Sequence, residues 1–261
     1  MSEFDITGCS ALITGASAGI GREFARQLAG RAGSLVLVAR RLDRLEALRD
    51  ELTKKDPNLN VHCRAVDLSQ SNQVDELCAW LEREKITVAF LINNAGLGDR
   101  GPFATSDPQR VREMLAVNIV ALTMLTRALL PGMIEKRRGA ILNVSSSAGF
   151  LPIRKLAVYA ASKAYVTSFS EAVRGEVRKS GIVVTALCPG PVATEFDRVA
   201  QRSSSKRPYP NPGFAYVAVE DVVRVGLEAV KCDKPLVVPG IVMKIAMLLV
   251  RLTPMAILRR V

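Results

Sequence analysis

The chain alternates short apolar, β-branched runs with longer amphipathic stretches. The apolar runs, which we expect to be strands, are Ala11–Thr14, Leu35–Ala39, Val61–Val66, Ala89–Asn93, Ala140–Val144, Val183–Leu187 and Leu236–Val238. The stretches with helical periodicity lie between them, near residues 19–30, 41–54, 70–84, 107–131, 157–179 and 219–231. Strands that are apolar throughout, each followed by a helix, indicate a parallel sheet covered on both faces. We therefore predict an α/β protein with one doubly wound parallel sheet of about seven strands.

Two segments break this alternation. Residues 198–214 are polar, basic and proline-rich, and a loop of this length is more often functional or disordered than a simple connection. We interpret it as a lid over a substrate site within a domain that covers residues 1–240. Residues 241–261 form an apolar and basic tail, in which 14 of the 18 residues of Ile241–Leu258 are apolar.

The tail is predicted to be a helix that ends or kinks at Pro254. A helix of about thirteen residues reaches about 20 Å, which is short of the roughly 30 Å core of a bilayer, so we do not expect a transmembrane span. Lys244 and Arg251 are seven residues apart and therefore share one helix face. The tail could lie on a membrane, cap a substrate cleft or pack between subunits.

Charge and cysteine content narrow the functional classes. The 261 residues include 36 Lys and Arg against 25 Asp and Glu, a net charge of +11, which suits nucleic acid, an anionic membrane or an anionic small molecule. No nucleic-acid recognition motif is present and the basic residues are not interleaved with aromatics, so we expect no nucleic-acid partner. Five scattered cysteines without a CxxC pair favour a reducing compartment. We expect a cytoplasmic protein without a signal peptide or a metal site.

A glycine-rich turn follows the first predicted strand. The segment reads Thr14-Gly15-Ala16-Ser17-Ala18-Gly19-Ile20-Gly21, and a helical pattern begins at once. Glycines at such a turn let the backbone approach a pyrophosphate, and the helix N-terminus offers free N–H groups and partial positive charge. The spacing Gly-x-x-x-Gly-x-Gly resembles the fingerprint of the short-chain dehydrogenase/reductase family.

Further motifs extend this resemblance from about residue 6 to residue 240. Asp67-Leu68 is similar to the pair that meets the adenine ring, Asn93-Asn94-Ala95-Gly96 matches the family's motif after the fourth strand, and Pro189-Gly190 with Thr194 resembles the segment that holds the nicotinamide carboxamide. The resemblance implies a single Rossmann-type domain and an oligomer, a homodimer or homotetramer packed through the helix that carries Tyr159. The residues that it implies for cofactor binding are Thr14, Gly15, Ser17, Gly19, Ile20, Gly21, Arg40, Asp67, Leu68, Asn94, Ala95, Gly96, Tyr159, Lys163, Pro189, Gly190, Val192 and Thr194.

The end of the second predicted strand indicates which cofactor is used. An NAD-binding site usually places an acid there to bind the ribose 2′-hydroxyl, whereas this chain reads Val38-Ala39-Arg40-Arg41. A guanidinium pairs with a 2′-phosphate and an acid would repel it. We therefore favour NADPH/NADP+ over NAD(H), chiefly because of Arg40. Ala18 departs from many NADPH-preferring relatives, which carry Lys or Arg at that position.

Four residues form the candidate catalytic set. Tyr159 and Lys163 are four residues apart and so lie on one helix face, where an ammonium could lower the phenol's pKa from about 10. By resemblance, Ser146, thirteen residues before Tyr159, is the catalytic serine that hydrogen-bonds the substrate oxygen, and Asn118 supports a water near the lysine. In this scheme Lys163 holds the nicotinamide ribose and Tyr159 protonates the oxygen.

The resulting hypothesis is an NADPH-dependent reductase of a ketone, aldehyde or 3-oxoacyl group. The apolar segment Gly149–Ile153 and the loop from about Val192 to Phe214 are expected to line the substrate cleft and suggest a lipophilic substrate. Arg198, Arg202, Lys206 and Arg207 could meet a charged carrier such as coenzyme A or belong to a solvated lid. An alcohol or hydroxysteroid dehydrogenase working oxidatively, or a non-catalytic NADPH-binding regulator, is the alternative. The tail resembles the lipid, steroid and 3-oxoacyl branch of the family, which leaves peripheral membrane contact open.

Overall fold

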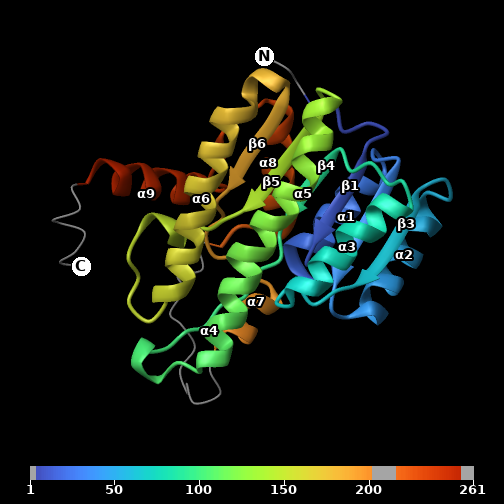
Figure 1. Ribbon diagram of the computed structural model, residues 1–261. Coiled ribbons are helices and arrows are strands. Elements are labelled where there is room, and N and C mark those ends of the chain that lie inside the picture. The colour runs from blue at the N-terminus through green and yellow to red at the C-terminus, as the bar shows by residue number, and fades with distance from the viewer. Residues whose placement is uncertain (1–3, 202–215, 254–261) are drawn as a thin grey trace.

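The computed structural model describes residues 4–201 and 216–253. Seven parallel strands form one sheet, as predicted, and their order is β3-β2-β1-β4-β5-β6-β7 (Figure 1). The strands are β1 (Ser10–Thr14), β2 (Ser34–Ala39), β3 (Asn60–Ala65), β4 (Phe90–Asn93), β5 (Gly139–Val144), β6 (Ile182–Leu187) and β7 (Leu236–Val237). Strand order reverses on either side of β1, and crevices beyond the carboxyl ends of strands at such a point are where α/β proteins bind ligands.

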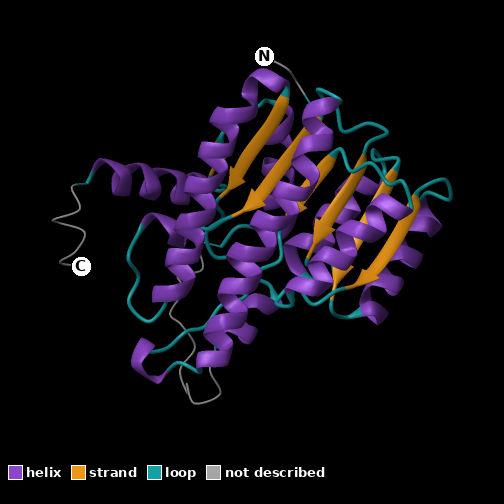
Figure 2. Ribbon diagram, viewed as in Figure 1, coloured by secondary structure: helices purple, strands orange, loops and turns teal. Residues whose placement is uncertain are grey.

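Helices cover both faces of the sheet (Figure 2). They are α1 (Gly19–Ala29), α2 (Leu42–Lys55), α3 (Ser71–Arg83), α4 (Pro108–Leu115), α5 (Leu122–Glu135), α6 (Ala157–Val177), α7 (Glu195–Ala200), α8 (Val219–Lys231) and α9 (Ile241–Leu252). One core packs α1, α2 and α8 against the sheet through residues such as Phe24, Leu45 and Val222. The other packs α3, α5 and α6 against the opposite face through Val74, Leu125 and similar residues.

The stretch predicted as one helix over 107–131 is longer and is interrupted. Between α4 and α5 a π-helical segment spans Ala116–Ala121, which contains Asn118. Among the described residues, Pro108–Glu135 is the one helical stretch long and apolar enough to cross a membrane by length and composition. It is a core helix on one side, because Met114, Leu122 and Leu125 are buried against the body of the protein.

The two segments that break the sequence pattern have different outcomes. Residues 198–200, predicted as the start of the lid loop, belong to α7, which begins with a side-chain cap from Thr194. Most of the predicted lid, including Arg202, Lys206 and Arg207, lies outside the described residues. The tail forms α9 as predicted, and the helix extends away from the sheet (Figure 1).

Candidate active site

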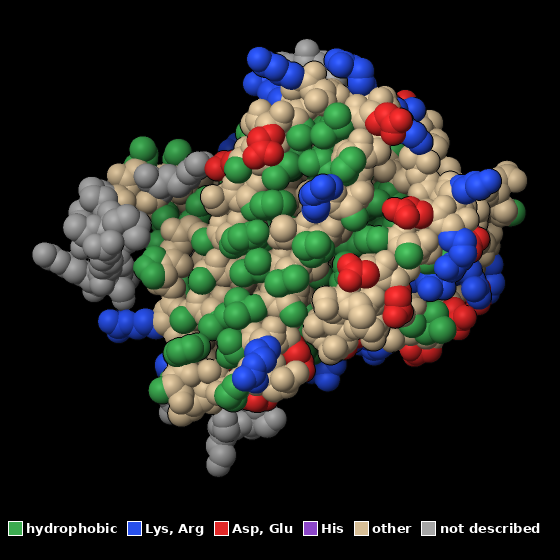
Figure 3. Space-filling view, viewed as in Figure 1, with side chains coloured by type: hydrophobic (Ala, Val, Ile, Leu, Met, Phe, Trp, Pro, Cys, Tyr) green, Lys and Arg blue, Asp and Glu red, His purple; other side chains and the backbone are tan. Residues whose placement is uncertain are grey.

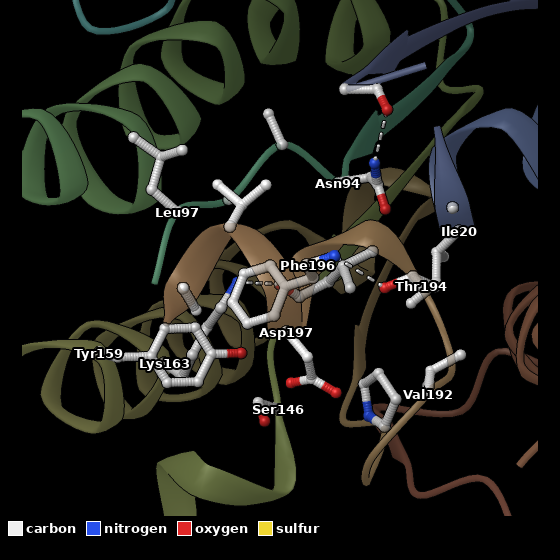
Figure 4. Close-up of a pocket in the computed structure, with 18 of the residues that line it drawn as sticks. Ile20, Asn94, Leu97, Ser146, Tyr159, Lys163, Val192, Thr194, Phe196 and Asp197 are labelled. Carbon is white, nitrogen blue, oxygen red and sulfur yellow. Dashed lines mark hydrogen bonds between the residues drawn. The ribbon is translucent and has the colours of Figure 1, made fainter. Parts of the chain in front are cut away.

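A cavity of about 640 Å³ lies beyond the carboxyl ends of β1, β4, β5 and β6. It brings together most of the residues singled out in the sequence, from the glycine turn at one end to Ser146 and Tyr159 at the other (Figure 4). Three of those residues do not line it: Thr14, Gly21 and Asn118 lie behind its wall. They therefore shape the cavity rather than face it.

The glycine turn between β1 and α1 takes a conformation that other residues rarely adopt. Gly15 and Gly19 have φ angles of 68° and 52°. A Cβ on Gly21 would overlap the carbonyl oxygen of Gly15, so the helix can pack on the turn only without a side chain there. Helix α1 has no acid in its first turn and no side-chain cap at Ala18. Its first amides are consequently open to an anion.

Thr14 and Asn94 fasten this turn to the end of β4. The Thr14 hydroxyl accepts hydrogen bonds from the backbone N–H groups of Asn94 and Ala95, both at 3.0 Å. The Asn94 side-chain amide donates to the Thr14 carbonyl at 2.8 Å. Two segments eighty residues apart in sequence are thus held as one rigid floor of the cavity.

The two arginines after β2 have different surroundings. Both line the cavity. The guanidinium of Arg41 donates to the Ser17 hydroxyl at 3.0 Å and to the carboxylate of Glu195 at 3.0 Å. No hydrogen bond or ion pair joins Arg40 to another described residue. Arg40 therefore has the more available guanidinium, whereas Arg41 ties the glycine turn to α7.

Asp67 and Leu68 line the cavity after β3. The Asp67 carboxylate accepts hydrogen bonds from the backbone N–H and the hydroxyl of Ser69, at 3.0 and 2.8 Å. These bonds fix the carboxylate at the end of the cavity that also holds Arg40. Pro189, Gly190, Val192 and Thr194 line the cavity after β6.

Ser146 differs from its neighbour Ser145 in the hydrogen bonds that it makes. Ser145 is buried and donates to the Lys163 carbonyl at 2.7 Å, so its hydroxyl is not available to a ligand. The Ser146 oxygen accepts from the Ala148 N–H at 3.1 Å, so its O–H can donate toward the Tyr159 hydroxyl and the cavity. Figure 4 shows Ser146 and the Tyr159 hydroxyl facing the same part of the cavity.

Burial raises the pKa of Tyr159 to about 12, and the charge of Asp197 acts in the same direction. A hydrogen bond with Ser146 opposes this shift. The phenol is therefore protonated at neutral pH. Lys163, which was expected to lower this pKa, is not among the groups that shift it: its Nζ lies over the ring, 5.8 Å from the centroid, and donates to the Val144 carbonyl.

Lys163 is buried, and desolvation lowers its pKa to about 8. Its Nζ donates to the Val144 carbonyl at 2.8 Å. Asn118 lies close by, and its side chain accepts from the Leu97 N–H at 2.8 Å and donates to the Leu97 carbonyl at 2.9 Å. It also donates to Ser162 at 2.9 Å, which links the π-helical segment to α6. Asn118 thus braces the wall of the cavity that follows Gly96.

Helices α7 and α9 contribute residues that the sequence did not single out. The ring of Phe196 lies 5.4 Å from that of Tyr159, and Asp197 points toward the same region (Figure 4). Met243 and Met247 of α9 line the cavity, so the tail caps the cleft. The position of α7 directly after the Pro189-Gly190 motif was the one available signal. Nothing in the pattern of α9 indicated which of its apolar residues face inward.

Much of the rest of the cavity lining is apolar, although Arg100 and Asp197 also belong to it. Its large apolar side chains are Leu97, Leu151, Ile153, Leu156, Phe196, Val199, Met243 and Met247. Leu151 and Ile153 come from the segment that the sequence assigned to the substrate cleft. In residues 4–201 and 216–253, no group of three or more His, Cys, Asp or Glu side chains is placed to hold a metal ion.

The site fits a nicotinamide dinucleotide. The positive-φ glycines leave space for a pyrophosphate at the uncapped start of α1, and Arg40 lines the same cavity after β2. A Cβ on Gly96 would come within 3.3 Å of Lys163 Nζ, so the backbone there is kept close to the Lys163 amine. The residues present are thus compatible with a dinucleotide that runs from Arg40 to Lys163.

Comparison with known proteins agrees with this geometry. A family model described as short chain dehydrogenase matches residues 10–204. Sulfoacetaldehyde reductase of Chromohalobacter salexigens is 42% identical over 196 residues, which cover 74% of this chain and 76% of that protein. Very-long-chain 3-oxoacyl-CoA reductase of Bos taurus is 32% identical over 204 residues, which cover 77% of this chain. The matched part is 64% of the bovine protein, so the chain spans less than two thirds of that relative.

A solved structure extends the likeness to the fold. The short-chain dehydrogenase from Sphingobium yanoikuyae in complex with NADPH superposes with a TM-score of 0.82 at 31% identity. The superposition covers 89% of this chain and 88% of that one. The fold, the order of the motifs and the matched family model lead to one assignment: the chain belongs to the short-chain dehydrogenase/reductase family of oxidoreductases.

Proposed function

We propose that the protein is an NADPH-dependent reductase that converts a carbonyl group of a lipophilic ketone, aldehyde or 3-oxoacyl compound to an alcohol. The observation that carries this proposal is the position of Tyr159 and Ser146. They line the same cavity as the glycine turn and as large apolar side chains such as Leu151 and Met247. A carbonyl placed there would have its chain among apolar side chains and its oxygen beside two hydroxyl groups.

Tyr159 is the general acid in this scheme. Its raised pKa keeps the phenol protonated at neutral pH, which suits proton donation to an oxygen that gains negative charge. Ser146 donates its O–H to the same oxygen and stabilises the charge that develops on it. The bound cofactor supplies the hydride.

Lys163 and Asn118 support this centre. Lys163 Nζ is within reach of the wall made by Gly96 and is protonated for the most part at pH 7, because its pKa of about 8 lies above that pH. We propose that it holds the nicotinamide ribose. Asn118 fixes the backbone of Leu97 and thereby the wall against which the lysine lies.

The preference for NADPH over NADH rests on Arg40. Its guanidinium lines the cavity at the end of β2, where the ribose 2′ position of a bound dinucleotide would lie by resemblance to the family. A phosphate there would pair with the guanidinium, and no acid from the end of β2 competes with it. Arg41 is a weaker candidate for binding the 2′-phosphate because its guanidinium already donates to Ser17 and to Glu195.

The apolar side chains of the cavity support a lipophilic substrate. They come from the segment after β5, from α7 and from α9, and Met side chains of the kind found at positions 243 and 247 adapt to ligands of varied shape. Asp197 faces this region, and Arg100 lines the same cavity, so the charge of the lining does not by itself select or exclude an anionic substrate.

We propose that the chain forms a homodimer, which can pair further into a tetramer. Apolar side chains gather over α5 and α6 on the face shown in Figure 3. Val120, Met124 and Tyr165 are exposed there, although large apolar residues on a monomer's surface are usually covered when they cluster. Sedimentation analysis of Met124→Arg should show a shift to monomer if this face is the interface.

We also propose a cytoplasmic protein that contacts membranes through the outward face of α9. Six large apolar residues of this helix are between 45% and 73% exposed: Ile241, Val242, Ile245, Leu248, Leu249 and Leu252. The tail over 241–261 contains four basic and no acidic residues, which suits an anionic lipid surface. Co-sedimentation with anionic but not with neutral vesicles is the expected result.

The test of the proposed function is a substrate screen. Ketones, aldehydes and 3-oxoacyl thioesters of increasing chain length, together with sulfoacetaldehyde as a small anionic aldehyde, are offered with NADPH and in parallel with NADH. We expect NADPH oxidation to rise with the length of the apolar chain. Turnover restricted to the oxidation of alcohols or hydroxysteroids would favour the reverse direction, and cofactor binding without any turnover would favour a regulatory role.

A further inference from the structure

A carboxylate from α7 spans the cavity mouth to two arginines at the start of α2. Glu195, the first residue of α7, accepts from Arg41 at 3.0 Å and from Arg44 at 3.0 and 3.1 Å. The two guanidinium groups hold the pKa of Glu195 below its ordinary value of 4.5. Glu195 is therefore ionised at neutral pH and joins the substrate side of the cleft to the cofactor side.

This bridge uses an arginine of the candidate 2′-phosphate site. Arg41 directs one side of its guanidinium to the Ser17 hydroxyl and the other to Glu195. Its neighbour Arg40 lines the same cavity and bonds to no other described side chain. The guanidinium of Arg40 is thus available to an anion, whereas that of Arg41 is already paired with the carboxylate of Glu195.

The bridge is weak enough to be exchanged. The side chains of Arg41 and Glu195 are 42% and 37% exposed, and ion pairs at such exposure contribute little to stability. A phosphate carries more charge and more acceptor oxygens than a carboxylate and pairs with a guanidinium in the same two-pronged way. Arg44 holds Glu195 independently, so α7 stays attached when Arg41 turns away.

From these contacts we propose that Glu195 sets the strength of 2′-phosphate recognition by competing for Arg41. In the free protein the Glu195 carboxylate is ion-paired with Arg41. A 2′-phosphate bound at Arg40 must displace this carboxylate before it can also pair with the Arg41 guanidinium. Glu195 is accordingly a specificity-determining residue that lowers the discrimination between cofactors with and without the phosphate. The inference rests on the proposed use of NADPH.

The competition also connects cofactor recognition to the substrate side. Glu195 lies between Thr194, which lines the cavity after β6, and Phe196, whose ring packs 5.4 Å from Tyr159. Release of Arg41 removes one of the two ion pairs that join Glu195 to the start of α2. The 2′-phosphate thereby changes a contact next to Phe196, whose ring packs on that of Tyr159.

The experiment measures binding of cofactor fragments by calorimetry. The probes are 2′,5′-ADP, which carries the 2′-phosphate, and 5′-AMP, which does not. We expect Glu195→Gln to tighten 2′,5′-ADP about tenfold, because one charge-assisted pair becomes available without competition, and to leave 5′-AMP unchanged. In an Arg41→Ala background the same substitution should have no effect on either probe.

Asp43→Asn is the matched control. Asp43 is an exposed acid in the first turn of the same helix as Arg44, and it forms no ion pair with either arginine among the described residues. It removes one negative charge near the site without freeing Arg41, so it should change 2′,5′-ADP binding less than twofold. Glu195→Ala serves as a second variant, and thermal unfolding of each variant establishes that it is folded.

Three results would overturn the inference. They are an unchanged affinity of Glu195→Gln and Glu195→Ala for 2′,5′-ADP, an equal gain for 5′-AMP, or a gain that persists without Arg41. Failure of the proposed NADPH preference looks different. In that case the unsubstituted protein binds 2′,5′-ADP no more tightly than 5′-AMP, and Arg40→Ala has no effect on the difference.

Discussion

The two walls of the cleft are built from different kinds of interaction. The cofactor wall consists of turns at strand ends, fastened by backbone groups and by the short side chains of Thr14 and Asn94. The substrate wall consists of α7 and α9, which are placed by longer side chains such as Phe196 and Met243 and by the ion pairs of Glu195. The first wall has little freedom to vary, because its geometry depends on glycines and main-chain bonds. The second can change its lining while the fold stays the same.

Removal of the Tyr159 hydroxyl should slow the chemical step without changing how either wall of the cleft binds its ligand. Tyr159→Phe keeps the ring against Phe196 but removes the proton donor, so turnover should fall by about 1,000-fold. Binding of NADPH and of substrate should remain within about twofold, as measured by fluorescence titration. Substantial residual turnover would show that another group delivers the proton.

Lys163 lies where the walls meet and should lower stability near neutral pH. Its pKa falls from an ordinary 10.5 to about 8 in the folded protein, so the folded state disfavours the charged form. The penalty is present in full below about pH 8 and disappears as pH rises toward 10.5, with an upper limit of about 3 kcal/mol. Lys163→Met should therefore gain melting temperature relative to the unsubstituted protein below pH 8 and lose that advantage by pH 10.5.

The control for this pH effect is Lys231→Met. Lys231 is exposed at the end of α8, and its replacement should give a difference in melting temperature that does not vary between pH 7 and 10.5. A Lys163→Met difference that is equally flat would mean that the lysine carries no desolvation penalty.

A methyl group on Gly21 should distort the cofactor wall and leave the substrate wall unchanged. In Gly21→Ala the new Cβ overlaps the Gly15 carbonyl, so the glycine turn must shift and NADPH should bind about tenfold or more weakly. Gly30→Ala, at the other end of the same helix, is the control, since nothing lies within 4 Å of a Cβ at that position. Equal cofactor affinities for the two variants would contradict the close packing inferred for the turn.

Shortening the inward face of α9 should have the smallest effect and act on the substrate wall alone. Met243→Ala with Met247→Ala should raise KM for long-chain carbonyl substrates about fivefold. The two substitutions remove apolar contact with the ligand that contributes about 1 kcal/mol or more of binding free energy. Cofactor affinity and KM for short substrates should stay the same. Leu248→Ala on the outward face, assayed without membranes, provides the comparison.

The contrast between the walls also explains what could be predicted from sequence. All seven strands and the main helices were predicted because buried parallel strands are apolar throughout and the helices have one apolar face. The glycine turn of the cofactor wall was predicted because it stands between the first strand and the first helix, and the Asn94 segment was predicted because it resembles the family's motif. Both signals are local in sequence.

The substrate wall could not be predicted in the same detail. Asp197 lies 38 residues from Tyr159 in sequence, and only the packing of α7 across the cleft brings them together. Met243 and Met247 face inward because of the direction in which α9 leaves Gly240, which has a φ of 82°. The apolar pattern of α9 continues around most of the helix, so it does not distinguish an inward from an outward side.

The π-helical segment at Ala116–Ala121 makes the active site sensitive to chain length. A π segment accommodates one residue more than regular α-helix would, and so rotates α4 by about 100° relative to α5. Deletion of a single residue there would let the helix return to regular winding. Asn118 would then turn away from Leu97, while α5 and the sheet kept their places. The extra residue of this segment thus sets the direction of Asn118, and loss of activity in a fully folded variant that lacks one residue there would demonstrate it.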